Sequence, residues 1–327
     1  MDNPTLPDWT GPFHRRLGAL ELTVISDRTY LLDGGAFFGV VPKTLWNRDA
    51  PADPLNRVRT AMNSLLVRLN DKLVLIETGC GDKLGEKQVR NWGVDPRRDY
   101  LERLGAAGFA PEAVEVVVNT HLHYDHCGWN TRRREDGAVV ATFPKARYYV
   151  QRQEWEHARE QHERDRVSYL TDNYDPLVAS GQMTLLEGDR ELLPGLSVVC
   201  LPGHTRGLQG VVVRSGSETA CYISDLMPTH WHLKPTWVMG FDLFPLETIA
   251  NKHRILEQAA REHWLWCSPT TPRSRGAMWS SGTVSTISFL PEHPFHPAAK
   301  VKILSQGQHT SAGCRASQLQ GREGGTR

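Results

Sequence analysis

The sequence lacks the features that direct a chain to a membrane or to nucleic acid. No apolar run approaches the roughly 18 residues that a membrane-spanning helix needs. The formal net charge is only +1, so no overall field favours nucleic acid or an anionic lipid surface. Arg132-Arg133-Arg134 is a short basic run of the kind that usually lies on a solvated loop. We therefore expect a small-molecule substrate and neither nucleic acid nor membrane as partner.

Paired cysteines are also absent. The 6 cysteines are scattered and contain no C-x-x-C pair, which argues against a zinc ribbon and against a disulfide framework. Residues 1–7 contain neither the basic nor the apolar region of a signal peptide. We expect a cytoplasmic protein, and these features carry no information on its oligomeric state.

A cluster of metal-binding residue types is present. His121-Leu122-His123-Tyr124-Asp125-His126 places four potential ligands within one short segment. Imidazole nitrogens and carboxylates suit Zn²⁺ and similar divalent ions. The preceding apolar run, Val114 to Thr120, is typical of a buried strand. The cluster is therefore predicted to lie where a strand ends and a loop begins.

Most other segments read as strands. Ala19–Ser26 alternates at period two, and the segments 62–69 and 72–77 flank a turn at Asn70-Asp71. Further predicted strands cover residues 146–150, 196–201, 210–214 and 219–223. Several of these strands end in His or Asp, so we expect an α/β fold with two sheets, helices between the strands and a site at one edge.

Three segments are predicted to be helical. They are residues 100–107, 153–166 and 246–262. The second is strongly charged and is expected to present a solvated face. In the third, Ile249, Ile255, Leu256 and Ala260 are expected to face inward.

Two further strand ends supply candidate ligands. His204 lies in Pro202-Gly203-His204-Thr205, which follows the predicted strand 196–201. Asp225 follows the predicted strand 219–223. A lone His after Gly is usually a surface residue, and a lone Asp is usually a turn former. Together with the upstream cluster, however, both are predicted to bind metal, and Asp225 offers a carboxylate that can bridge two cations.

These motifs resemble those of the metallo-β-lactamase superfamily, over residues from about 20 to about 265. Residues 33–42 and 61–64 are similar to its lactonase and organophosphate-hydrolase branch. The resemblance implies an αββα sandwich with two Zn²⁺ per chain, or other divalent metals. It assigns His121, His123 and His204 to one metal, and Asp125, His126 and a last histidine to the other. Asp225 would bridge the two.

The implied activity is hydrolysis of an ester, lactone or related acyl bond by a hydroxide shared between the metals. Asp125 is the candidate catalytic residue, because it can steer a proton. A glyoxalase II-like thioesterase is close in chemistry, whereas a mononuclear dioxygenase would not need both Asp125 and His126. Phe37, Phe38, His230, Trp231 and Trp237 are candidate pocket residues, with core or lid packing as the alternative.

The last histidine is missing where the family pattern expects His-Asp-Pro. The sequence there reads Trp266-Cys267-Ser268-Pro269-Thr270-Thr271-Pro272, and residues 267–327 are about one-quarter Ser and Thr. That composition predicts a disordered or non-native tail after a domain of residues 1–266. The alternatives for the missing ligand are His230, His232 or His263.

A change of reading frame would explain the loss. Read one base earlier, the Trp266/Cys267 junction must encode Val, and the junctions from Pro269 to Pro272 can encode His-Asp-Pro. We hypothesise that the tail is out of frame, and the alternative is a genuinely divergent tail. As written, the chain can be a catalytically impaired product. Resequencing the gene decides between them: a shifted frame without His-Asp-Pro contradicts the hypothesis.

Overall fold

Two mixed β-sheets form the centre of the computed structural model, which describes residues 12–267. The larger sheet has 7 strands in the order β1-β2-β3-β4-β5-β8-β9, and the smaller has 5 in the order β10 to β14. The strands of the larger sheet are β1 (Phe13–Leu17), β2 (Leu20–Asp33), β3 (Arg57–Leu69), β4 (Lys72–Ile76), β5 (Val114–Val118), β8 (Arg147–Gln151) and β9 (Met183–Leu186). Those of the smaller are β10 (Arg190–Leu193), β11 (Leu196–Cys200), β12 (Gln209–Ser215), β13 (Glu218–Tyr222) and β14 (Leu265–Cys267). A separate hairpin pairs β6 (Thr131–Arg133) with β7 (Val139–Ala141).

The two sheets pack against each other through alternate side chains. In β3, Leu65 and Val67 join residues of the smaller sheet, such as Val211, in one apolar cluster. Leu66, between them, faces the opposite way and packs with Tyr100. Because both faces of β4 and β5 are buried, these two strands are almost continuously apolar in sequence.

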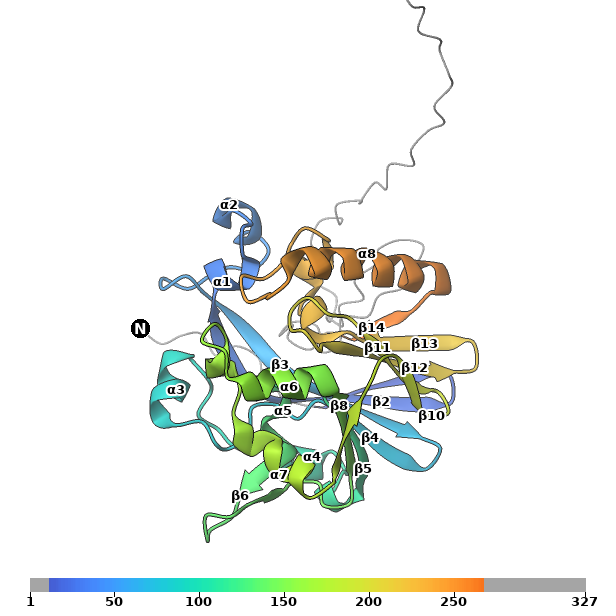
Figure 1. The fold of residues 1–327 in the computed structure, drawn as a ribbon. Helices are drawn as coiled ribbons and strands as arrows, with labels where there is room; N and C mark the ends of the chain where they lie inside the picture. Colours follow the sequence, from blue (N-terminus) through green and yellow to red (C-terminus); the bar gives the residue numbers. More distant parts are fainter. Residues whose placement is uncertain (1–11, 268–327) are drawn as a thin grey trace, which may run out of the picture. The chain divides into compact units, whose positions relative to one another are not determined.

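Helices cover the two outer faces, which confirms the predicted αββα layers. Helices α4 (Tyr100–Ala106), α6 (Arg152–Glu160) and α7 (Asp175–Ala179) contribute buried side chains to the cluster on the larger sheet. Helix α8 (Pro245–Glu262) covers the smaller sheet, where Ile255 and Ala259 pack with Val212 and Cys221 (Figure 1). Short helices occupy connections: α1 (Gly34–Phe38), α2 (Lys43–Trp46), α3 (Glu86–Asn91) and α5 (Tyr124–Cys127). No helix within residues 12–267 is long and apolar enough to cross a membrane.

The predicted helices need two corrections. The charged helix ends at Glu160 rather than 166, because Gln161 takes a left-handed conformation with φ of 49°. It is also not a purely solvated face, since Glu154 and His157 are buried. In α8 the buried residues are Thr248, Lys252, Ile255 and Ala259, one of which is a lysine. The predicted tail and its changed reading frame lie outside the described residues, apart from Cys267.

Candidate metal centre

The predicted ligands meet at one edge of the two sheets, beyond the carboxyl ends of three strands. Residues 119–126, here called the histidine loop, follow β5 of the larger sheet. His204 follows β11 in a segment that we call the 202–205 turn, and Asp225 follows β13. In the smaller sheet β12 lies between β11 and β13 and is antiparallel to both, so β11 and β13 run in the same direction. The ends of β11 and β13 therefore lie at the same edge.

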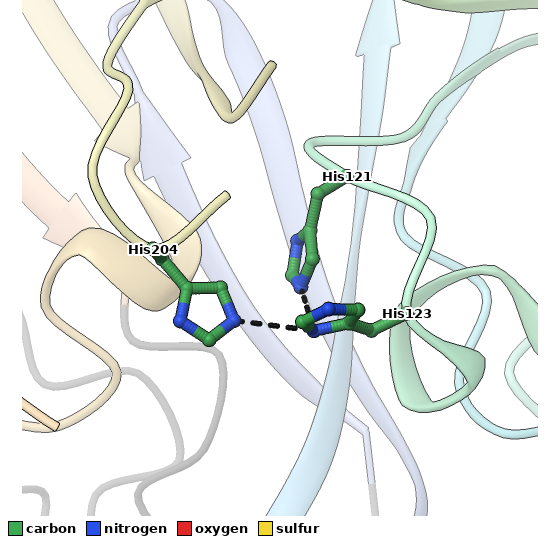
Figure 2. A group of neighbouring side chains, drawn as sticks. All are labelled: His121, His123 and His204. Atoms are coloured by element: carbon green, nitrogen blue, oxygen red, sulfur yellow. Dashed lines mark hydrogen bonds between the residues drawn. The ribbon is translucent and has the colours of Figure 1, made fainter. Parts of the chain in front are cut away.

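Three imidazole rings converge on one point. His121 Nε2 lies 3.1 Å from His123 Nδ1, and His204 Nε2 lies 3.2 Å from the same nitrogen (Figure 2). All three side chains are buried, with at most 9% exposed. Nitrogens bound at about 2.0–2.1 Å around a tetrahedral ion are separated by about 3.3 Å. The two measured separations are close to this value, and the ligand atoms of the three residues all lie within 4.8 Å of one another, so the group could hold a zinc-sized ion.

Asp225 faces two groups of ligands at once. Its Oδ2 lies 3.4 Å from His204 Nε2, while its Oδ1 lies 3.5 Å from His126 Nε2. Asp125 Oδ2 approaches the same nitrogen of His126 at 3.5 Å. The carboxylate of Asp225 therefore stands between the three converging imidazoles and the Asp125–His126 pair.

Several buried polar atoms of this cluster have no hydrogen-bond partner among the described residues. They include His126 Nε2 and Asp225 Oδ1, which face each other. Buried polar atoms without partners are costly and rare. A cation between the imidazoles and the carboxylates would satisfy these atoms, so the donor set fits a metal.

The electrostatics of the cluster favour bound positive charge. Burial and the neighbouring imidazoles of His126 and His123 hold the pKa of His121 well below its ordinary value, which leaves a lone pair free for a metal. Burial alone would also lower the pKa of His126, but Asp225 and Asp125 raise it well above the ordinary value. Burial disfavours the charged form of Asp225, yet His126 and His204 lower the pKa of its carboxyl. The two carboxylates therefore stabilise positive charge at His126.

Two more carboxylates stand behind the rings, and the sequence reasoning missed both. Asp242 Oδ1 lies 3.0 Å from His204 Nδ1, and Glu77 Oε1 lies 3.7 Å from His126 Nδ1. Glu77, His121 and His126 are also close enough together to hold an ion. We interpret Glu77 as a group that orients His126, because the opposite ring nitrogen faces Asp125 and Asp225.

The position of Glu77 could have been recognised in the sequence, because it directly follows strand β4, just as the predicted ligands directly follow other strands. Glu77 and Ser224, which precedes Asp225, both adopt a positive φ, of 63° and 47°. Such strained residues gather at functional sites. Asp242 has no comparable signal in the sequence.

A cavity of about 540 Å³ opens onto the metal-ligand candidates. Its wall includes His123, Asp125, His204 and Asp225. Tyr30 also lines it and donates a hydrogen bond of 3.1 Å to Asp125 Oδ2. The rest of the wall combines apolar side chains, among them Leu32, Phe37, Leu55, Val167, Met239, Phe241 and Leu243, with the charged residues Asp33, Arg57, Arg164 and Asp165.

The predicted pocket residues divide between the cavity and the core. Phe37 lines the cavity, whereas Phe38 is fully buried against Trp46, Trp231 and Trp237. His230 packs on Trp231 and is not among the residues that line the cavity. His232 ties this aromatic cluster to α1 through a 3.0 Å contact with the carbonyl oxygen of Phe37.

The layers and the histidine-rich edge define an αββα protein built to hold metal ions at a sheet edge. The chain belongs to the metallo-beta-lactamase superfamily, whose model matches residues 58–258. This confirms the resemblance on which the sequence interpretation depended.

The chain is similar to lactonases and to a probable metal-dependent hydrolase. An N-acyl homoserine lactonase from Bacillus sp. is 32% identical over 164 residues, which span 46% of this chain and 57% of that relative, less than two thirds of its length. The structure of a probable metal-dependent hydrolase from Staphylococcus aureus is 27% identical, with a TM-score of 0.76, covering 81% of this chain and 94% of that one. AidC, a dizinc quorum-quenching lactonase in complex with a homoserine product, shares the fold at 20% identity and a TM-score of 0.69, covering 88% and 100%.

Proposed function

We propose that the chain is a metal-dependent hydrolase of lactones, esters and related acyl bonds. One observation carries this proposal: the two carboxylate oxygens of Asp225 face two different ligand groups, at 3.4 Å and 3.5 Å. A single structural metal would need only one of these groups. Two adjacent metals share such a carboxylate in hydrolytic centres.

The ligand roles follow from the geometry. His121 Nε2, His123 Nδ1 and His204 Nε2 would hold one ion. Asp125 and His126 would hold the other, with Asp225 between the two. Zinc suits this set of nitrogen and carboxylate donors. When bound, such ions lower the pKa of water and polarise a carbonyl oxygen.

The second group is one ligand short of the family pattern. Within residues 12–267 it comprises Asp125, His126 and the shared Asp225, and the sequence has no His-Asp-Pro after β14. We infer that the second ion binds more weakly than the first in the chain as written. An impaired product therefore stays the alternative to a fully active enzyme.

The protein groups around the cavity are suited to an uncharged acyl bond attached to an apolar group. Asp125 lies in the wall of the cavity, where it can accept a proton from the attacking water. Tyr30 fixes the orientation of that carboxylate by its hydrogen bond. Phe37, Met239 and Phe241 offer apolar surface next to it. The lactonases among the relatives support a lactone as the first substrate class to test.

A substrate panel separates the alternatives. Zinc-loaded protein should hydrolyse N-acyl homoserine lactones and simple esters faster than thioesters such as an acyl-glutathione. Asp225→Asn should reduce the rate of hydrolysis to that of the uncatalysed reaction. Faster thioester cleavage would support the glyoxalase II-like alternative. Protein that binds zinc and cleaves none of these substrates would contradict the proposal.

We also propose a cytoplasmic location, in keeping with the free thiols of Cys80, Cys127, Cys200, Cys221 and Cys267.

A further inference from the structure

Glu154 is a buried carboxylate that contacts both segments carrying the converging imidazoles. The backbone N–H of Leu122, in the histidine loop, donates to Glu154 Oε1 at 3.0 Å. The hydroxyl of Thr205, in the 202–205 turn, donates to Glu154 Oε2 at 2.6 Å. Leu122 lies between His121 and His123, and Thr205 directly follows His204. One side chain thus joins the two segments next to their ligands.

Glu154 lies on α6, a helix whose position is fixed by packing in the core. Ala158, one turn further along α6, is fully buried in the core on the larger sheet. A Cβ atom added to Gly207 would lie 2.3 Å from the backbone nitrogen of Glu154, so the chain just after the 202–205 turn contacts the helix backbone directly. The position of the turn relative to α6 therefore tolerates little movement.

A third contact connects Glu154 to the ring of a candidate ligand. Tyr169 donates its hydroxyl to Glu154 Oε1 at 3.1 Å. The ring of Tyr169 packs edge-on against that of His123, with centroids 4.8 Å apart. Glu154 thereby restrains His123 both through its loop and through the aromatic ring beside it.

The chemistry of a carboxylate matches this task. Its two oxygens accept hydrogen bonds in different directions, so it can serve donors from two separate segments. Glu154 is 0% exposed, and no Lys or Arg among residues 12–267 forms an ion pair with it. A buried carboxylate without a cation is costly unless its hydrogen bonds are all made. A purely apolar residue would fill the same space at lower cost.

We propose that Glu154 is a positioning residue that sets the distance between the histidine loop and the 202–205 turn, and so fixes the three imidazoles in a metal-binding arrangement. The inference rests on the proposed metal-dependent function, but it concerns the precision of the site and not the substrate. Residues that hold metal ligands in place contribute roughly 10- to 100-fold to metal affinity.

The test uses the full chain and Co²⁺ as the probe metal, because the visible absorption of Co²⁺ reports the geometry of its ligands. Thr205→Val removes one link and keeps the side-chain shape. Glu154→Met removes all three links, whereas Glu154→Gln can keep them, with its amide donating to Thr205. Glu156→Gln, on the exposed face of the same helix, is the matched control.

We expect Thr205→Val and Glu154→Met to weaken Co²⁺ binding about tenfold or more in competition with a chelator, and to alter the Co²⁺ spectrum. Glu154→Gln should retain most of the affinity, and Glu156→Gln all of it. Thermal unfolding of the metal-free proteins separates positioning from stability. Variants that unfold at lower temperature but bind Co²⁺ with the wild-type affinity and spectrum would overturn the inference.

Thr205→Val decides the question if Glu154→Met does not fold. Wild-type protein that binds no Co²⁺ would contradict both this inference and the proposed function. Wild-type protein that binds Co²⁺ and cleaves no acyl bond would contradict the proposed function alone, and the comparison of variants would still test Glu154.

Discussion

At the residue scale, the metal-ligand candidates are held from behind by acidic side chains. Asp242 contacts the outer ring nitrogen of His204, and Glu77 contacts that of His126. Such contacts fix the ring orientation and tautomer, and they make the facing nitrogen a better donor. We therefore expect the metal affinity of the site to depend on side chains behind the ligands as well as on the ligands themselves.

Replacement of Asp242 should show this dependence. Asp242→Asn is expected to weaken zinc binding about 10- to 100-fold, because the amide is a poorer acceptor for the His204 N–H. Titration of the metal-free protein with zinc in competition with a chelator measures the change. Asp136→Asn, at an exposed position, serves as the control. Equal zinc affinities for Asp242→Asn and wild type would show that Asp242 does not contribute to metal binding.

Lys252 predicts a pH dependence of stability. Burial lowers the pKa of this fully buried amine to about 7, although Asp242 opposes the shift, and the ammonium donates to the Trp237 carbonyl. Between about pH 7 and pH 10 the unfolded chain, with an ordinary lysine pKa of about 10.4, binds more protons than the folded chain. The free energy of unfolding should therefore rise with pH in this window, by up to about 1.4 kcal/mol per pH unit.

Lys252→Met should lack that rise. Urea unfolding of wild type and variant at pH 7, 8 and 9 provides the measurement, with the exposed Lys145→Met as control. Parallel stability profiles of wild type and Lys252→Met would show that the buried amine does not titrate in this range.

At the scale of elements, the hairpin between β3 and β4 turns at two positions whose backbone conformations favour glycine. Asn70 and Asp71 have φ of 48° and 66°, as the two central residues of a type I′ turn do. Asp71→Gly should stabilise the protein by about 0.5–1 kcal/mol, since glycine adopts positive φ without the steric cost. Chemical unfolding measures this gain, and a loss of stability would mean that the Asp71 side chain contributes more than its backbone strain costs.

The elements also show which strands and site residues could be predicted from the sequence, and why others could not. The apolar runs located β5, β11 and β13, because burial leaves a local pattern in the sequence. Alternation located only the first half of β2, which continues to Asp33 and is buried on both faces from Leu22 to Tyr30. The ligand candidates followed from their places at strand ends. Glu154 and Asp242 were missed because their partners lie far away in sequence, at Leu122, Thr205 and His204. The buried face of α8 was misjudged because Lys252 finds carbonyl acceptors that its own helix does not supply.

At the scale of the whole molecule, the candidate metal centre links the two sheets. The histidine loop follows β5 of the larger sheet, while His204 and Asp225 follow strands of the smaller. A metal held by all of them would oppose separation of the sheets during unfolding.

Zinc should therefore stabilise the fold. At a free concentration of 100 times its dissociation constant, it should raise the free energy of unfolding by about 2.7 kcal/mol. Thermal unfolding with zinc and with excess chelator measures the effect, and His204→Ala should reduce it. Identical melting temperatures with and without zinc would show that the metal does not connect the sheets.

A zinc titration of the metal-free protein, with lactone hydrolysis recorded at each step, tests the proposed metal centre directly. We expect no hydrolysis without metal, and a rate that grows as zinc fills the His121, His123 and His204 group and then the weaker Asp125 and His126 group. A folded protein with zinc bound at both groups and no hydrolysis of any lactone or ester would contradict this expectation.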